Sequence, residues 1–447
     1  MNNQGRFLTG STMGHVVRMT LTGALGITFV FVVDAANLFW VSTLGDPRMM
    51  AAIGYAFSIQ FFTVSIGVGM MIAATALVSR AIGSGDRALA RRNATGALML
   101  TVFVQSVVAA LVVVLRFPIL DLAGATGETA QIAARYLVIS IPTLVIMAIG
   151  LIGSSVLRAE GDGHRAMYVT LISGGVAMVV DPLLIVGLGW GVDGAALGVG
   201  VSRVVMAIVA LWFAIGTHDL FARPSTLAVK EVLRPFAIIA LPSILTQCAT
   251  PFGNFVLTAI IAEYGDDSVA AWAVVSRLTV VAFGGLFALS GAIGGIFGQN
   301  FGASQYDRLR SIYMDSVKFC IFYTFVVWAV LAAATPWILA AFSIPEEAAP
   351  VLRSFTYIGA GAFVFNGLLY VSNAAFNTLG KPGRSTLVNW VREGLLTYPV
   401  ALVLTASFAA PGVILTQAVL AVVVGTASAL WGWHFVRGFG PVYRAAA

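Results

Sequence analysis

Two aspartates interrupt stretches of sequence that are otherwise almost wholly apolar. Asp34 lies in the run 29–45 with Asn37 one helical turn later, and Asp181 opens the run DPLLIVG. A carboxylate inside a run long enough to cross a bilayer is costly to keep there, and such acids usually serve proton or cation transfer. The alternative is a purely structural hydrogen bond between packed helices. We predict that Asp34, Asn37 and Asp181 form a cation or proton site.

A second group of polar residues also falls within apolar runs. An interhelical hydrogen bond is the common role of such residues in membrane proteins, and a place in the wall of a substrate cavity is the functional alternative. Arg277 stands about as deep in its run as Glu393 does in another, so a pair between them is conceivable although it would have to span a gap. The candidates for lining a substrate cavity are Tyr55, Gln60, Asn254 and Arg277.

The elements that must position these residues are membrane-spanning helices. Of the 447 residues, 59% are hydrophobic and only 10% are charged, which is far too few charges for a large soluble protein. Apolar runs of about 20 residues recur, each long enough to span the hydrocarbon layer of a bilayer. We predict an all-α polytopic protein with twelve transmembrane helices, at 17–41, 51–78, 94–115, 133–156, 167–188, 194–216, 236–262, 269–296, 313–334, 352–376, 386–406 and 412–434.

The charged residues predict an orientation. Lysine and arginine concentrate in alternate loops, and such loops face the cytoplasm. Both termini are therefore expected to be cytoplasmic. The net charge of +6 is accounted for by these loops, so no nucleic-acid partner is predicted. The basic residues of the inner loops are Arg80, Arg87, Arg91, Arg92, Arg158, Arg165, Arg223, Lys230, Arg234, Arg308, Arg310, Lys381 and Arg384.

The chain repeats itself at a nearly constant spacing. AAIGYAF at 51–57 matches AAWAVVS at 270–276, and two glycine loops recur at that same spacing, Gly83 with Gly302 and Gly161 with Gly380. Two parallel six-helix halves are a transporter architecture with the binding site between them. The halves differ in chemistry, because Asn254 stands where the repeat would place the partner of Asp34.

The repeat also divides the chain. We predict an N-terminal lobe at 1–216, a cytoplasmic linker at 217–235 and a C-terminal lobe at 236–447. The only two cysteines lie in apolar runs, and no metal-ligand spacing is present. The match of 189–194 to G-x-G-x-x-G has no strand before it and carries no dinucleotide site. No enzyme activity, metal or cofactor is predicted beyond a coupling ion, H+ or Na+.

Several motifs resemble the multidrug and toxic compound extrusion (MATE) family, and most closely its DinF-like bacterial branch. They are DAANLFWVSTLGD, the GSG loop at 83–85, RAEGDGHR, VVDPLLIVGLGWGVDGAALG, AEYGDDSVAAWAVVSRL, FGQNFGA and NTLGKP. The resemblance covers nearly the whole chain in order and spacing. It implies two six-helix lobes in a V shape, alternating access, and export of organic cations or similar amphiphiles in exchange for H+ or Na+.

The resemblance also bears on the coupling ion. The family's first-lobe site uses an acid on helix 1, which falls on Asn37 here with Asp34 one turn earlier, and an acid on helix 5, which is Asp181. The positions of a helper asparagine and a hydroxyl are occupied by Ala177 and Val199. Because Na+ needs several oxygen ligands and burial disfavours a charged carboxylate, H+ is the expected ion and Na+ the alternative.

These observations lead to one expected function and two alternatives. The expected function is a secondary antiporter of the inner membrane, acting as a monomer, that exports small cationic or amphiphilic organic compounds in exchange for H+. The first alternative is a lipid-linked oligosaccharide flippase or exporter of the same superfamily. The second is an intramembrane lipid-modifying enzyme. Against the flippase, no dense set of cationic residues lines the centre of the spans, as a pyrophosphate-linked substrate would need. Against the enzyme, only the acids of the first lobe could form a cluster at one depth.

Overall fold

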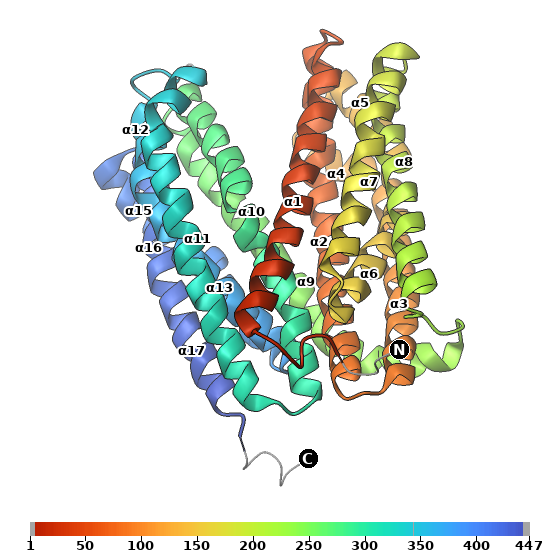
Figure 1. The fold of residues 1–447 in the computed structure, drawn as a ribbon. Helices are drawn as coiled ribbons and strands as arrows, with labels where there is room; N and C mark the ends of the chain where they lie inside the picture. Colours follow the sequence, from red (N-terminus) through yellow and green to blue (C-terminus); the bar gives the residue numbers. More distant parts are fainter. Residues whose placement is uncertain (1–4, 343, 441–447) are drawn as a thin grey trace. The chain divides into compact units, whose positions relative to one another are not determined.

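A computed structural model of the chain describes residues 5–342 and 344–440, and in these ranges it consists of helices, turns and loops with no strand. Figure 1 shows the helices grouped in two bundles, one made mainly from the first half of the chain and one mainly from the second. Ten helices of the described ranges are long and apolar enough to cross a membrane, and the pair Gly127–Ser140 and Leu144–Glu160, bent by 50°, gives an eleventh. The span predicted at 386–406 falls in the helical stretch 382–408, which contains the charged residues Arg392 and Glu393 and is not among the described helices that meet this test.

The packing divides the chain into two units, and the division falls inside α9, between Ile244 and Leu245. The linker after Thr217 belongs to the first unit and is fastened to α3, because Arg91 donates to the Phe221 carbonyl at 3.1 Å. The first unit is built from α1 (Thr12–Ser42, from Leu25 on), α2 (Pro47–Gly83), α3 (Arg87–Val114), α4 (Arg116–Leu122), α5 (Gly127–Ser140), α6 (Leu144–Glu160), α7 (Gly163–Pro182), η1 (Leu183–Gly187), α8 (Gly191–Leu211), η2 (Trp212–Thr217) and the start of α9 (Thr226–Ala262).

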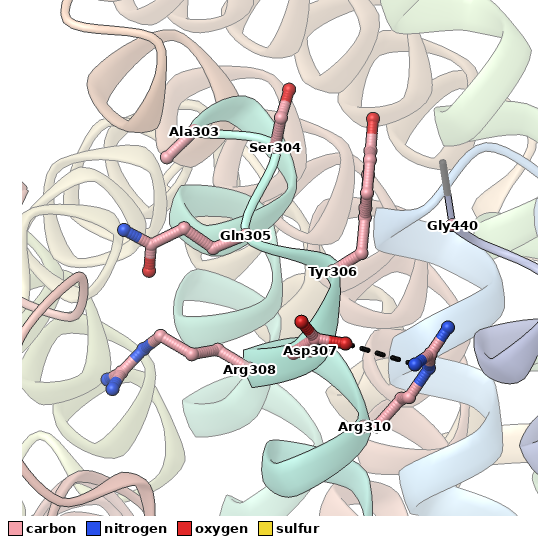
Figure 2. A pocket seen from close by; sticks show the side chains of 8 residues that line it. All are labelled: Ala303, Ser304, Gln305, Tyr306, Asp307, Arg308, Arg310 and Gly440. Carbon is pink, nitrogen blue, oxygen red and sulfur yellow. Dashed lines mark hydrogen bonds and ion pairs between the residues drawn. The ribbon is translucent and has the colours of Figure 1, made fainter. Parts of the chain in front are cut away.

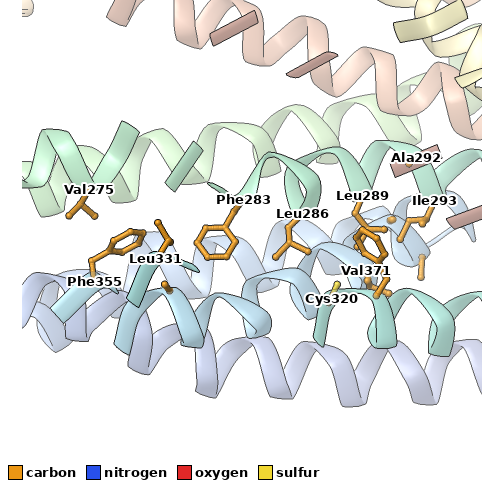
Figure 3. Packing of buried hydrophobic residues seen from close by; sticks show 14 of the residues in the cluster. Val275, Phe283, Leu286, Leu289, Ala292, Ile293, Cys320, Leu331, Phe355 and Val371 are labelled. Carbon is orange, nitrogen blue, oxygen red and sulfur yellow. The ribbon is translucent and has the colours of Figure 1, made fainter. Parts of the chain in front are cut away.

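The second unit has a continuous apolar core along α10. Figure 3 shows Phe283, Leu286 and Leu289 of that helix beside Cys320 and Val371, and all five side chains are buried. The unit is built from the rest of α9, α10 (Asp266–Gly302), α11 (Tyr306–Ala341), α12 (Ala349–Ser354), η3 (Phe355–Gly359), α13 (Ala360–Thr378), α14 (Pro382–Trp390), η4 (Val391–Leu396), α15 (Thr397–Phe408), α16 (Pro411–Leu420), η5 (Ala421–Gly425) and α17 (Thr426–Arg437).

The internal repeat predicted from the glycine loops is visible in the helix bounds. Both ends of α10 follow those of α2 by the spacing that separates Gly83 from Gly302, and α11 and α14 begin at the same spacing after α3 and α7. The turns that end α6 and α13 also correspond, since Gly161 and Gly380 both have positive φ values, 92° and 101°. Only glycine adopts this backbone without strain, which is why these loops keep it.

The first helix belongs to both units. Residues 5–24 pack with the second unit, whereas α1 from Leu25 onward packs with the first. The segment before the helix is held by α10 and α11: the Phe7 amide donates to Gln299 Oε1 at 2.9 Å, and Arg308 donates to the carbonyls of Phe7 and Gly10. These bonds satisfy backbone groups that a loop would otherwise present to water, so the segment has a defined place in the second unit.

Two π-helical turns lie at the acids of the membrane-spanning helices. Pro182 ends α7, and the helix continues into the π turn η1, after which the Leu188 amide donates to the Leu183 carbonyl at 2.8 Å. In the second unit the turn η4 contains Glu393 itself. Single π turns inside helices occur frequently at functional sites, because they re-aim side chains at the expense of regular hydrogen bonding.

Candidate functional site

Asp181 is the centre of the polar site in the first unit. It stands in the last turn of α7 with 3% of its surface exposed. Asn37 of α1 donates from Nδ2 to Asp181 Oδ2 at 2.7 Å, which joins the two helices. Helix α8 approaches from the other side at Gly198, where an added Cβ would overlap Asp181 Oδ1. The carboxylate is therefore enclosed by three helices, and a glycine leaves the room for it.

The other carboxylate oxygen is unused. Asp181 Oδ1 is buried and accepts no hydrogen bond from any of the described residues. A buried oxygen that lacks a donor costs free energy, and in native proteins such an atom commonly marks a place where a proton, an ion or a water is bound. The oxygen therefore points to a site that takes a cation or a proton.

The surroundings offer few further oxygens. Ala177, one turn before Asp181, is buried, and Val199, next to Gly198, is half-buried. Neither side chain can coordinate a metal ion. No group of three or more histidine, cysteine, aspartate or glutamate side chains gathers anywhere in the described ranges. The side chains at these two positions therefore add no oxygen ligand to the carboxylate of Asp181 and the amide of Asn37.

Asp34 lies one turn before Asn37 and is the more exposed of the two. Its side chain is exposed and makes no hydrogen bond with the described residues. The nearest charges that act on it are those of Arg203 and Asp181. Sequence reasoning expected Asp34 to share the site directly, whereas Asn37 makes the bond to Asp181. Asp34 is thus the exposed acid beside an enclosed acid–amide pair.

Arg203 of α8 is a residue that the sequence reasoning did not single out. Its guanidinium group is 8% exposed and donates to the Ser140 carbonyl at 2.8 Å, to Thr143 Oγ1 at 2.7 Å and to Gln60 Oε1 at 3.4 Å. It forms no ion pair within the described ranges, so three neutral oxygens hold a buried positive charge. The available signal was a single arginine within the apolar run 194–216.

The cavity candidates of the first unit have identified partners. Gln60 is buried, donates from Nε2 to Ser140 Oγ at 2.7 Å and accepts from Arg203, so it belongs to the network that holds that arginine. The Tyr55 hydroxyl donates to the Gly124 carbonyl at 3.4 Å. Gln60 thus bonds to another helix and Tyr55 to the turn after α4, and a role for either residue in a substrate cavity stays a prediction.

The candidates of the second unit do not come together. Asn254 and Arg277 are both exposed, and Arg277 has no ion-pair partner among the described residues. The conceivable pair of Arg277 with Glu393 is not formed. Glu393 Oε1 instead lies 3.5 Å from Nε of the adjacent Arg392. Both residues of this neighbouring pair stand in the π turn η4.

A pocket of about 610 Å³ lies elsewhere, at the turn between α10 and α11. Figure 2 shows that its wall comes mainly from the turn itself, with Arg308 and Arg310 extending in opposite directions and Asp307 paired with Arg310. None of the predicted site residues lines it, so it is separate from the Asp181 site.

A repeated set of membrane-spanning helices with enclosed acids is typical of a multi-pass membrane transporter. A family model described as MatE matches residues 24–183 and 242–403, one match in each half, and the chain accordingly belongs to the MatE family of transporters. The resemblance deduced from the loop motifs is thereby confirmed. The prediction that the protein is not an enzyme is also confirmed, because members of this family are transporters.

Two relatives match almost the whole chain. A protein of Shewanella oneidensis named FAD transporter is 26% identical over 404 residues, covering 88% of each chain. The multidrug export protein MepA of Staphylococcus aureus (strain N315) is 22% identical over 408 residues, covering 89% of this chain and 88% of MepA. These matches extend through both units.

Solved structures of transporters share the fold. One is a transporter of the MOP superfamily from Pyrococcus furiosus, described with a binding pocket of reverse polarity, with a TM-score of 0.90 and 22% identity over 97% of this chain and 98% of that one. Another is a mutant of the MATE transporter VcmN from Vibrio cholerae, with a TM-score of 0.90 and 20% identity over the same shares. They confirm the two-lobe helical fold class.

Proposed function

We propose that the protein is an antiporter of the inner membrane that exports small cationic or amphiphilic organic compounds in exchange for H+. The observation that carries the proposal is the buried Asp181, which shares one oxygen with Asn37 and leaves the other without a donor. Transport of organic cargo is supported by the names of the relatives, one a multidrug export protein.

The bond to Asn37 gives the proton a structural effect. An ionised Asp181 accepts from the Asn37 amide, and proton uptake turns one carboxylate oxygen into a donor that needs an acceptor of its own. Pro182 lacks an amide hydrogen and is followed directly by the π turn η1, so α7 is irregular just where the charge changes. Protonation thereby favours a different fit of α7 against α1 and α8.

The rest of the proposal concerns placement in the membrane. The excess of basic residues in alternate loops supports cytoplasmic termini. Each unit has a hydrophobic core of its own, which supports a protein that acts as a monomer.

The test is transport in proteoliposomes with imposed ion gradients. A cationic dye should be transported in exchange for protons that move down their gradient, and a Na+ gradient should not replace the proton gradient. We expect Asp181→Asn to lower proton-coupled transport at least tenfold, with Asp121→Asn, an exposed acid of α4, as the unaffected control. Full coupled transport by Asp181→Asn, or transport driven by Na+ alone, would contradict the proposal.

A second candidate cargo is a flavin nucleotide, as in the relative named FAD transporter. The intramembrane arginines favour it, because a buried Arg203 and an exposed Arg277 can attract phosphate groups. Flavin nucleotides loaded into the same vesicles distinguish the two cargoes, since the dye and the nucleotide carry opposite charges.

A further inference from the structure

We propose that the second unit contains its own binding site for a monovalent organic cation, formed by the carboxylate of Glu393 and the aromatic rings of Trp390 and Phe252. The inference rests on the proposed function, because it names the place where the positive charge of the cargo is bound. It does not involve Asp181, so the two sites can be tested separately.

Glu393 is an acid kept within the apolar helical stretch 382–408. Its side chain is 13% exposed, which leaves it enclosed but reachable. Its only ion pair among the described residues is with Arg392, at 3.5 Å between Oε1 and Nε. A pair at this distance between sequence neighbours is weakly directional compared with the shorter, two-pronged geometry that guanidinium and carboxylate prefer. A cationic ligand can therefore share or replace Arg392 as the partner of Glu393.

Helix α9 leaves space for this carboxylate. A Cβ at Gly253 would overlap Glu393 Oε2 and lie 2.8 Å from its Cδ. The repeat pairs Gly253 of α9 with Val33 of α1, and Glu393 of η4 with Gly174 of α7. In the first unit the glycine thus stands at the position of the acid, and its neighbour Val33 is apolar. The acid of the second unit is thus a feature of that unit alone and has no counterpart inherited from Asp181.

Aromatic side chains flank the carboxylate. Trp390 stands one helical turn before Glu393, and its ring lies 5.6 Å from that of Phe252, the neighbour of Gly253. The Trp390 ring is fixed by a hydrogen bond of 2.9 Å from Nε1 to the Leu245 carbonyl. Phe252 is 39% exposed, so this pair of rings is open to a ligand.

A second aromatic wall stands on α13 and α10. Tyr370 interacts electrostatically with both Arg392 and Glu393. Its ring packs 5.7 Å from that of Phe287, which in turn lies 5.9 Å from the ring of Phe363. Tyr370, Phe287 and Phe363 therefore form an aromatic cluster that joins α13 and α10.

This combination selects a particular class of ligand. A carboxylate attracts any cation, but aromatic faces add attraction for a cation with diffuse charge, such as a quaternary ammonium or phosphonium group. A metal ion would need several oxygen ligands, and Glu393 is the single carboxylate of the site. The site is consequently suited to the charged head of a lipophilic organic cation.

The experiment measures binding of tetraphenylphosphonium to the purified full-length protein by equilibrium dialysis. We expect Glu393→Gln to weaken binding at least tenfold, because a desolvated charge partner is lost. Glu263→Gln, which removes an exposed acid at the end of α9, is the matched control and should bind as the wild type does. Asp181→Asn should keep its affinity for the probe while losing proton-coupled transport.

The ring variants keep the inference testable if Glu393→Gln does not fold. Trp390→Phe keeps an aromatic face and should bind within about threefold of wild type, whereas Trp390→Leu should lose about tenfold. Gly253→Ala should also weaken binding, with Gly291→Ala as the control because a Cβ there meets nothing within 4 Å.

Each result bears on the inference. Wild-type affinity in Glu393→Gln, or equal binding by Trp390→Phe and Trp390→Leu, would overturn it while leaving the antiport proposal intact. A wild-type protein that transports flavin nucleotide with protons but never binds the probe would overturn both the inference and the cationic cargo.

Discussion

The close approach of α8 to Asp181 makes Gly198→Ala the most informative single change. The added methyl would occupy the position of Asp181 Oδ1 and would lie 3.1 Å from the carboxylate carbon. The side chain must then rotate away or α8 must withdraw from α7. Either movement disturbs the bond from Asn37, which now measures 2.7 Å.

The magnitude follows from two effects. Overpacking a close helix contact costs about 1–3 kcal/mol. Loss of a hydrogen bond to a charged acceptor costs about 1.5–3 kcal/mol, and relaxation of α8 avoids part of one or the other. We expect a net loss of about 2–3 kcal/mol in the free energy of unfolding, and a fall of at least tenfold in proton-coupled transport.

The assay combines thermal unfolding in detergent with transport in proteoliposomes. The matched control is Gly175→Ala, on α7, because a Cβ at Gly175 meets nothing within 4 Å. That change should leave transport unaltered and stability unchanged or slightly raised, since alanine is the better helix former. If Gly198→Ala is as stable and as active as Gly175→Ala, the geometry assigned to Asp181 is wrong.

Two further changes test groups around the site and at the end of the first unit. Arg203→Met should lower the free energy of unfolding by about 3 kcal/mol, because three oxygen acceptors lose their donor, and Arg203→Lys should lower it by less. Chemical denaturation measures the difference, and equal stability of Arg203→Met and wild type would refute this prediction. Outside the spans, burial opposes ionisation of Asp162, but the hydrogen bonds from His218, at 2.8 Å, and Arg165 outweigh it and lower the pKa of Asp162. Because the pKa of Asp162 is lower in the folded protein than in the unfolded chain, its ionised carboxylate stabilises the fold at pH values above the unfolded pKa of about 4. This stabilisation is lost as the pH falls through the folded pKa. Unfolding followed from neutral to acidic pH should therefore show a smaller acid loss in Asp162→Asn, and an unchanged acid loss would count against the assignment.

The helical spans and the repeat could be predicted because they depend on simple properties. Apolar runs of bilayer length fix the spans, and the glycines at positive φ, such as Gly161 and Gly380, recur at the spacing of the helices. The candidate site was predictable only in part. Asn37 and Asp181 are brought together, as the spacing suggested. The exposure of Asp34 depends on how α1 is rotated, which hydrophobic periodicity in a nearly all-apolar helix does not define.

The remaining features depend on backbone geometry that sequence patterns do not encode. Arg392 and Glu393 are in contact within the π turn η4, and the pattern of apolar residues does not indicate a π turn. The acceptors of Arg203 come from α2 and from the bend after α5, so they could be identified only once those elements were packed. Contacts between distant segments therefore decide the surroundings of Arg203.

The shared first helix has a consequence for any attempt to produce the two halves as separate polypeptides. A cut between Ile244 and Leu245 would leave residues 5–24 on the wrong fragment, since they pack with α10 and α11. The carboxyl-terminal fragment alone would then lack the partner of Gln299 and Arg308. Co-expressed halves should assemble when residues 5–24 of the amino-terminal fragment pack with the carboxyl-terminal fragment. A deletion of the residues up to Ala24 should destabilise the second unit, although it lies in the amino-terminal part of the sequence.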